Sequence, residues 1–242
     1  MKRFAVLTPF EGDLPFVDRH PDDGAKVAAA LQRWHPDWQF DTWRVSQGQW
    51  PDDLSAYDGL VITGSPASVH DDHPWIGPLL QRLREQHERR MPMLGLCFGH
   101  QAIATALGGR VSASAPGLRV GTVTTTLNGT APWMQPPQAR ITLYAAHDEQ
   151  VATPPPGAQV LGGDADCPVG GYTLGRHILA LQYHPEFSRA FMDELLDALA
   201  PELGEAALAR GRAQVAQPVD AALVWGWVAR FFEQAMAARA QA

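Results

Sequence analysis

The chain has 242 residues, of which 45% are hydrophobic and 9% aromatic, and this composition supplies a sizeable core and excludes a disordered chain. Its 19 basic and 26 acidic side chains give a formal net charge of −7, so no basic surplus favours nucleic-acid binding. The apolar runs are too short for a signal peptide or a membrane span. The chain has only two cysteines, too few for a disulfide framework, and we expect a protein of the reducing cytoplasm.

The first half of the chain alternates short apolar runs with amphipathic segments. The expected strands are Arg3–Thr8, Trp38–Val45, Gly59–Thr63 and Met91–Leu96. The expected helices are Asp22–Trp34, Trp75–Arg90 and a segment from about Phe98 to Leu107. This alternation predicts an α/β fold with a doubly wound, mostly parallel sheet that carries helices on both faces.

Beyond residue 110 the sequence favours strands without helices between them, which indicates an antiparallel extension of the sheet. The expected strands are Val120–Leu127, Ile141–Ala146, Ala158–Leu161 and His177–Tyr183. A helix at Ser188–Ala200 and an alanine-rich helical tail at Glu202–Ala242 follow. We therefore predict a main domain over residues 1–200 and a helical extension over residues 201–242 that packs on it. The alternative to packing on the main domain is that the apolar face of the tail binds a partner subunit.

The most informative segment is residues 94–101, with the sequence L-G-L-C-F-G-H-Q. A buried strand runs into a cysteine flanked by Gly95 and Gly99, and a helix follows, which is the pattern of a nucleophile elbow. The thiol of Cys97 would lie at a helix N-terminus, where the helix dipole favours the thiolate. The alternative for Cys97 is a buried cysteine that serves only packing. For the second cysteine, Cys167, we favour this structural role, because it lies in a loop without an elbow.

A candidate base follows the strand His177–Tyr183. His184 lies at the carboxyl end of that strand, where open α/β sheets place their sites, and Glu186 could hydrogen-bond its second ring nitrogen. His100 is too close to Cys97 in sequence to serve. A strand-end histidine with a solvated glutamate would be the structural alternative.

Together these segments resemble the class I, triad-type glutamine amidotransferase domain, which has a flavodoxin-like α/β fold. The resemblance covers about residues 1–200 and rests on four segments in the family's order: 63–66 (T-G-S-P), 94–101, 146–148 (A-H-D) and 184–186 (H-P-E). Stand-alone relatives that share the G-S-P loop include the γ-glutamyl peptidases, and fused ones include the GMP synthetases. A different group of cysteine-elbow proteins lacks the late H-P-E segment and ranks lower.

The resemblance implies a hydrolase that cleaves the γ-amide of glutamine through a cysteine thioester and releases glutamate and ammonia. Cys97 would attack, His184 would act as acid and base, and Glu186 would orient the imidazole. The expected oxyanion donors are the backbone amides of Phe98, Gly64 and Ser65. The residues expected to contact the substrate are Gln101, Ala146, His147 and Asp148. Neither a cofactor nor a metal is implied, since oxygen and nitrogen donors at 70–73 (H-D-D-H) are a weak metal signal.

Several features leave the substrate and the partner open. Arg119 stands where relatives tend to carry an acidic residue, so it either inverts a local charge or is a solvated strand residue. No ATP-pyrophosphatase or phosphate-loop motif is present in the chain. The ammonia acceptor would therefore be a synthetase subunit on another chain, or there is none. A γ-glutamyl peptidase acting on glutathione-like amides, a partner-regulated subunit, a homo-oligomer and a regulatory module without turnover remain the alternatives.

Overall fold

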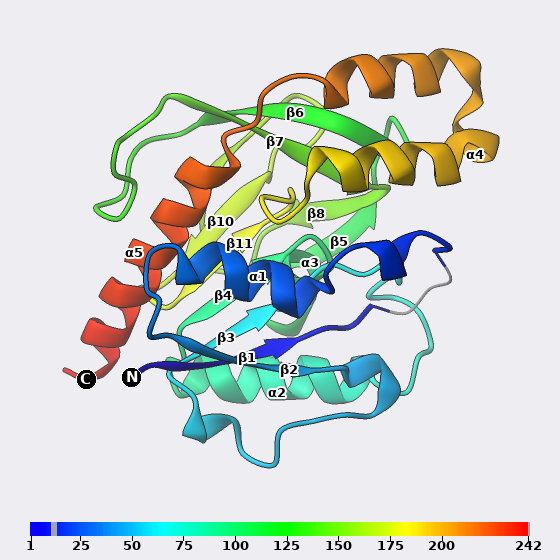
Figure 1. Cartoon of the computed structure of the whole chain (residues 1–242). Coiled ribbons are helices and arrows are strands. Elements are labelled where there is room, and N and C mark those ends of the chain that lie inside the picture. The colour runs from blue at the N-terminus through cyan, green and yellow to red at the C-terminus, as the bar shows by residue number, and fades with distance from the viewer. Residues whose placement is uncertain (11–13, 242) are drawn as a thin grey trace.

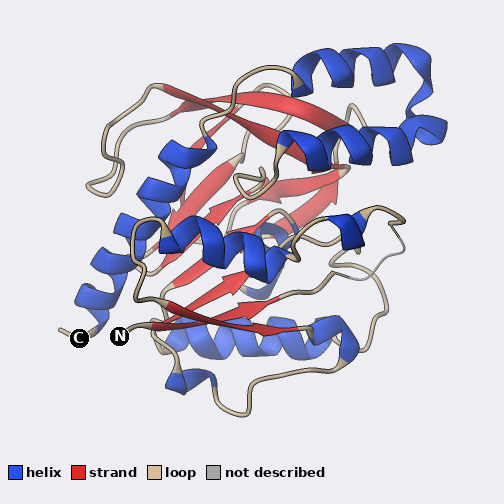
Figure 2. Ribbon diagram, viewed as in Figure 1, coloured by secondary structure: helices blue, strands red, loops and turns tan. Residues whose placement is uncertain are grey.

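A mixed β-sheet forms the centre of the protein, in a computed structural model that describes residues 1–10 and 14–241 (Figures 1 and 2). Its strands are β1 (Arg3–Leu7), β2 (Gln39–Trp43), β3 (Gly59–Ile62), β4 (Met93–Leu96), β6 (Arg119–Leu127), β7 (Arg140–His147), β9 (Gln159–Gly163), β10 (Gly171–Leu174) and β11 (Ile178–Leu181). They lie in the order β2-β1-β3-β4-β11-β10-β9-β6-β7. The first five in this order pair in parallel, and the remaining pairs are antiparallel. β5 (Arg110–Ala113) and β8 (Glu149–Thr153) form a separate antiparallel pair.

Helices cover both faces of the parallel part of the sheet. The helices are α1 (Asp23–Gln32), α2 (Ile76–Glu88), α3 (Phe98–Ala106), α4 (Arg189–Val215) and α5 (Ala221–Arg239), with short 3₁₀ turns at Val17–Arg19, Val45–Gln47 and Leu54–Ala56. Along β1, Phe4 and Val6 pack in one cluster with α1 and α5, whereas Ala5 and Leu7 pack in another with α2 and α3. This alternation buries both faces of the strand. The predicted doubly wound α/β fold, with its antiparallel extension, is confirmed.

Two parts of the secondary structure differ from the prediction. Strands β5, β8 and β10 were not expected, because each has only four or five residues and no long apolar run marks them. The helix expected at Ser188–Ala200 is longer than predicted, because α4 extends from Arg189 to Val215, and the helical tail continues in α5 only from Ala221. Pro218 lies between them and has no backbone N–H for a continuous helix.

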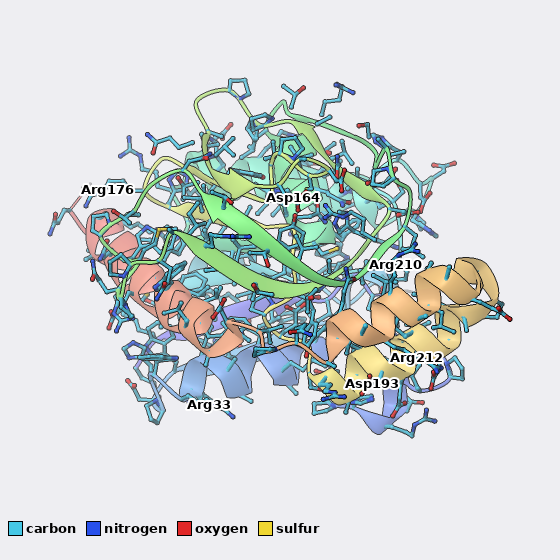
Figure 3. The ribbon with its side chains drawn as sticks, turned by 90° about the horizontal axis from the view of Figure 1, so that it is seen from above. Arg33, Asp164, Arg176, Asp193, Arg210 and Arg212 are labelled. Atoms are coloured by element: carbon cyan, nitrogen blue, oxygen red, sulfur yellow. The ribbon has the colours of Figure 1, made fainter. Side chains whose placement is uncertain are left out.

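Helix α4 bends back on itself and forms two arms. Gly204 adopts φ 71°, a left-handed conformation that ends the first arm and redirects the chain. The arms lie side by side beyond β6 and β7 (Figure 3), and Arg212 of the second arm pairs with Asp197 of the first at 2.7 Å. A third apolar cluster, which includes Tyr144 of β7 and Val215 of α4, packs beneath them. The second arm of α4 therefore shares an apolar cluster with β7. No helix within residues 1–10 and 14–241 is long and apolar enough to cross a membrane.

The packing of α3 against β3 requires a residue without a side chain at one position. A Cβ added at Gly99 would lie 2.9 Å from the carbonyl carbon of Ile62 and closer still to its oxygen. Both partners belong to regular elements in the centre of the fold, so neither can move at low cost. The glycine allows α3 to begin directly above the carboxyl end of β3.

We expect Gly99→Ala to lower the free energy of unfolding by about 1–3 kcal/mol, the usual cost of overpacking a core. Gly77→Ala in α2 is the matched control, because a Cβ there meets nothing within 4 Å. That variant should leave the free energy of unfolding unchanged or raise it by up to about 1 kcal/mol, because alanine favours a helix more than glycine does. Urea denaturation of both variants measures the difference, and equal midpoints would contradict the packing argument.

Candidate functional site

Cys97 occupies the sharp turn between β4 and α3. Its backbone adopts φ 49° and ψ −102°, a strained conformation for a residue with a side chain. The backbone N–H of Cys97 donates to Leu181 of β11 at 2.9 Å, so the turn is tied to the neighbouring strand. The cysteine is 5% exposed and stands at the N-cap position of α3. The turn therefore has the strand–elbow–helix form expected from the sequence.

His184 and Glu186 lie directly after β11, the strand beside β4. Nδ1 of His184 donates to Oε1 of Glu186 at 2.7 Å, and both side chains are almost fully buried. The backbone N–H of His184 donates to the Tyr144 carbonyl of β7 at 2.8 Å. The Phe187 ring stacks on the imidazole with centroids 3.9 Å apart. These contacts hold the imidazole at Nδ1 and on one face, and they tie its backbone to β7, which gives an acid–base group a fixed orientation.

The surroundings of His184 favour its protonated form. Burial alone would lower the pKa of this imidazole, but the charge of Glu186 and the nearby Cys97 side chain outweigh burial and raise the pKa to about 10. The second carboxylate oxygen of Glu186, Oε2, is buried and has no hydrogen-bond partner within residues 1–10 and 14–241. The carboxylate therefore depends on the imidazolium for its compensation.

The three residues expected as oxyanion donors come from two segments, the loop after β3 and the first turn of α3. A Cβ added at Gly64 would lie 3.1 Å from Cε1 of His184 and 3.7 Å from Cβ of Cys97, so the loop after β3 lies against both side chains. The hydroxyl of Ser65 donates to the Pro9 carbonyl at 2.8 Å and fixes this loop to the segment after β1. The amide of Phe98 is in the first turn of α3, where no carbonyl of the helix itself can accept its N–H.

Of the residues expected to contact substrate, three lie around the thiol. The Ala146 carbonyl accepts from Sγ of Cys97 at 3.8 Å. Gln101 donates to the Glu149 carbonyl at 2.8 Å, and Nδ1 of His147 contacts the same carbonyl at 3.0 Å. Burial lowers the pKa of His147 to about 4, so its imidazole is neutral at physiological pH. Asp148 differs, because it lies at the exposed turn before β8 and its carbonyl accepts from Ser114.

One residue at the thiol was missed by the sequence analysis. Nε2 of Gln182 donates to Sγ of Cys97 at 3.5 Å, and Gln182 is fully buried. Its Oε1 accepts from Gln101 at 3.4 Å, so the two amides form a short chain that ends on the sulfur. The signal in the sequence was a polar side chain at the end of an otherwise apolar strand, two residues before His184.

Arg119 and Cys167 belong to one structural network beside the site. Arg119 pairs with both carboxylate oxygens of Asp164, at 3.2 and 3.0 Å, and the hydroxyl of Tyr183 donates to the same carboxylate at 3.1 Å. The charge of Arg119 is therefore compensated by Asp164. Arg119 is neither an uncompensated inversion of the local charge nor a fully solvated strand residue, the two alternatives expected from the sequence. The backbone N–H of Cys167 also donates to Asp164, and burial raises the pKa of its thiol to about 11. The low reactivity of such a thiol fits a structural cysteine.

The possible metal ligands at 70–73 do not form a cluster. Within the part of the chain that the structure describes, no group of three or more His, Cys, Asp or Glu side chains could hold a metal ion. The His70 ring contacts the Val111 carbonyl at 3.3 Å, and Ser68 donates to Glu149 at 2.7 Å. This loop is thereby joined to β5 and β8 at the edge of the site.

Comparisons with known proteins agree with this geometry. The model of the family "Glutamine amidotransferase class-I" matches residues 31–196. Gamma-glutamyl peptidase 3 of Arabidopsis thaliana is 32% identical in an alignment of 168 residues that covers 66% of this chain and 67% of the peptidase. A glutamine-hydrolyzing GMP synthase of Clostridium kluyveri is 32% identical over 129 residues, which are 53% of this chain and 24% of the synthase. The chain thus spans about two thirds of the peptidase and a quarter of the synthase.

Solved structures show the same fold over nearly the whole chain. A glutamine amidotransferase of Thermotoga maritima superposes with a TM-score of 0.74 at 18% identity and covers 98% of both chains. A glutamine amidotransferase of Methylobacillus flagellatus gives a TM-score of 0.72 at 22% identity and covers 97% of this chain. The chain belongs to the class I glutamine amidotransferase family.

The pKa of His184 can be tested by removing the charge of Glu186. We expect Glu186→Gln to lower the pKa of His184 from about 10, because burial then acts without the opposing charge. In the wild type, protonated His184 stabilises the fold fully below about pH 6.5, and this contribution is lost as the pH rises through about 10. The loss of stability in the variant should therefore be largest near pH 6 and shrink toward pH 10, as denaturation at each pH measures.

The matched control is Glu194→Gln, which removes a partly exposed carboxylate that pairs with two residues far from Glu186 in the sequence, Arg19 and His20. It should leave the titration of His184, followed by NMR of the imidazole, unchanged. A wild-type His184 that loses its proton near pH 6.5 would contradict the argument.

Proposed function

We propose that this chain hydrolyses γ-glutamyl amides through a thioester on Cys97. The observation that carries the proposal is the placement of Cys97 in a strained elbow beside the hydrogen-bonded pair of His184 and Glu186. Acyl transfer needs a nucleophile and an oriented base, which this pair and Cys97 would supply, and donors for an oxyanion, which we assign to backbone amides beside the thiol. Membership in the class I family and the similarity to γ-glutamyl peptidases support an enzyme of this class.

In the acylation step, the thiolate of Cys97 attacks the γ-carbonyl carbon and the carbonyl oxygen becomes an oxyanion. The amides of Phe98, Gly64 and Ser65 are the proposed donors to that oxygen. His184 then gives its proton to the leaving nitrogen, the C–N bond breaks, and ammonia or an amine departs. The high pKa of His184 suits this role, because the imidazolium is the resting form that can donate a proton.

In the deacylation step, neutral His184 takes a proton from water, and the resulting hydroxide attacks the thioester carbon. The C–S bond breaks, glutamate leaves, and the proton on His184 restores the ion pair with the thiolate of Cys97. Glu186 keeps the imidazole in one orientation through both steps. None of these steps calls for a cofactor.

The proposed substrate subsite is formed by residues of α3, of the end of β7 and of the turn after it, apart from the His184–Glu186 pair. Gln101, Ala146, His147 and Asp148 are the proposed contacts to the amino-acid end of the γ-glutamyl group. The neutral His147 has a buried Nε2 without a partner within residues 1–10 and 14–241, and this acceptor suits an ammonium donor. Asp148 could act from the turn between β7 and β8 through its charge.

Glutamine is the simplest substrate that fits the proposal, and γ-glutamyl peptides such as glutathione are the second candidate. The similarity to γ-glutamyl peptidases, which extends over about two thirds of both chains, favours the second. Glutamine would make the chain a partner-regulated subunit that supplies ammonia to a synthetase subunit. Residues 1–200 would form the catalytic domain and residues 201–242 its extension. Both described cysteines are free, which supports a reducing, cytoplasmic location.

We expect Cys97→Ala to reduce kcat/KM for glutamate release by about 10,000-fold or more, as the loss of an enzymic nucleophile usually does. Cys167→Ala is the matched control and should retain most of the activity. Cys167 binds Asp164 through its backbone N–H, which alanine keeps. Glutamate release from glutamine and from glutathione, measured separately, identifies the preferred substrate. Equal rates for the Cys97→Ala variant and the wild type would overturn the proposal.

A further inference from the structure

The C-terminal extension reaches the His184–Glu186 segment through one buried hydrogen bond. Nε1 of Trp225, in α5, donates to the carbonyl of Pro185 at 3.0 Å. Pro185 lies between the two residues whose side chains form the imidazole–carboxylate pair, and Trp225 is only 4% exposed. Because proline has no backbone N–H, this carbonyl is the only hydrogen-bonding group of Pro185.

A second connection reaches the same segment through β7. The backbone N–H and carbonyl of Thr142 both bind Asp220, the residue before α5: the N–H donates to Oδ2 at 2.7 Å, and the carbonyl accepts from the Asp220 N–H at 2.8 Å. Two residues further along β7, the Tyr144 carbonyl accepts from the backbone N–H of His184. The start of α5 is therefore joined both to Pro185 and to the strand that supports His184.

The family match ends at residue 196, so α5 lies outside the segment by which the family is recognised. We infer that α5 is a positioning element for the candidate site, and that Trp225 holds the 184–186 segment so that the imidazole stays aligned with Cys97 and Glu186. This inference rests on the proposed function for its rate prediction. A displacement of a reacting group by 1 Å is enough to cost up to about a hundredfold in rate.

The chain offers a matched control on the same helix. Trp227 is 2% exposed, and its Nε1 donates to the carbonyl of another proline, Pro136, at 3.1 Å. Pro136 lies in the loop that joins the far ends of β6 and β7, since Thr126 pairs with Arg140 there and Arg119 with His147 at the site end. Trp225→Phe and Trp227→Phe thus remove the same kind of bond, one near the candidate site and one far from it.

The charged and titratable groups around His184 stay in place in both variants. They are Cys97 at the elbow, Glu186 on the same segment, His147 on β7, and the ion pair of Asp23 and Lys26 on α1. The Phe187 ring stacks on His184 and also contacts Lys26, whose Nζ lies 5.3 Å from the ring centroid. A change in the titration of the site in Trp225→Phe alone would therefore arise from the position of the segment.

The experiment compares the full-length wild type, Trp225→Phe and Trp227→Phe in two assays. The first is the rate of Cys97 alkylation by iodoacetamide across pH, with the modified residue identified by mass spectrometry. The second is kcat and KM for glutamate release. We expect Trp225→Phe to shift the pH profile of alkylation and to lower kcat about tenfold with little change in KM. Trp227→Phe should lower the thermal midpoint by a similar amount and leave both profiles within about twofold of the wild type.

The two assays separate the inference from the proposed function. A shift in alkylation confined to Trp225→Phe, with no glutamate release by any protein, would support the positioning role and reject the proposed function. Identical alkylation profiles in all three proteins, or equal changes in both variants, would overturn the positioning role. If Trp225→Phe does not fold, Asp220→Ala decides: a shifted alkylation profile supports the inference and an unchanged profile overturns it.

Discussion

The geometry of the candidate site depends on the backbone of Cys97. A residue with a side chain at φ 49° is strained by roughly 1–3 kcal/mol, and such a conformation persists only where the surroundings fix it. Here the hydrogen bond to Leu181 and the close approach of Gly99 to Ile62 supply that constraint from both neighbouring strands. The thiol that this turn presents contacts the Ala146 carbonyl and the Gln182 amide. The same turn places Cys97 at the N-cap position of α3, directly before the first amides of that helix.

The antiparallel half of the sheet supplies backbone carbonyl groups that contact His184 and the thiol of Cys97. β7 supplies the Tyr144 carbonyl that holds His184 and the Ala146 carbonyl that contacts the thiol. The first residue of β8, Glu149, supplies the carbonyl that accepts from Gln101. The long register between β6 and β7 keeps these positions fixed relative to one another. The antiparallel extension of the sheet therefore supplies contacts within the candidate site itself.

The sequence was sufficient where local chemistry decides the structure. The apolar runs and the glycines around Cys97 predicted the parallel strands and the elbow, because buried strands and sharp turns restrict which residues are tolerated. Short strands such as β10, and the interruption between α4 and α5, are decided by tertiary packing and leave little local pattern. Gln182 and Trp225 escaped prediction for the same reason. Each acts through a contact with a residue that only the fold brings close.

The buried charges near His184 explain why so many elements must meet there. A carboxylate with 0% side-chain exposure loses its hydration, and Oε2 of Glu186 finds no protein partner among the described residues. Its compensation comes from the imidazolium, which in turn needs the carboxylate to keep its proton in a buried place. The attraction between the imidazolium and the carboxylate weakens with distance, so the 2.7 Å hydrogen bond has to be maintained during thermal motion. A segment of three residues cannot hold that geometry alone, so support from β7, from the Phe187 ring and from α5 follows from the electrostatics of the pair.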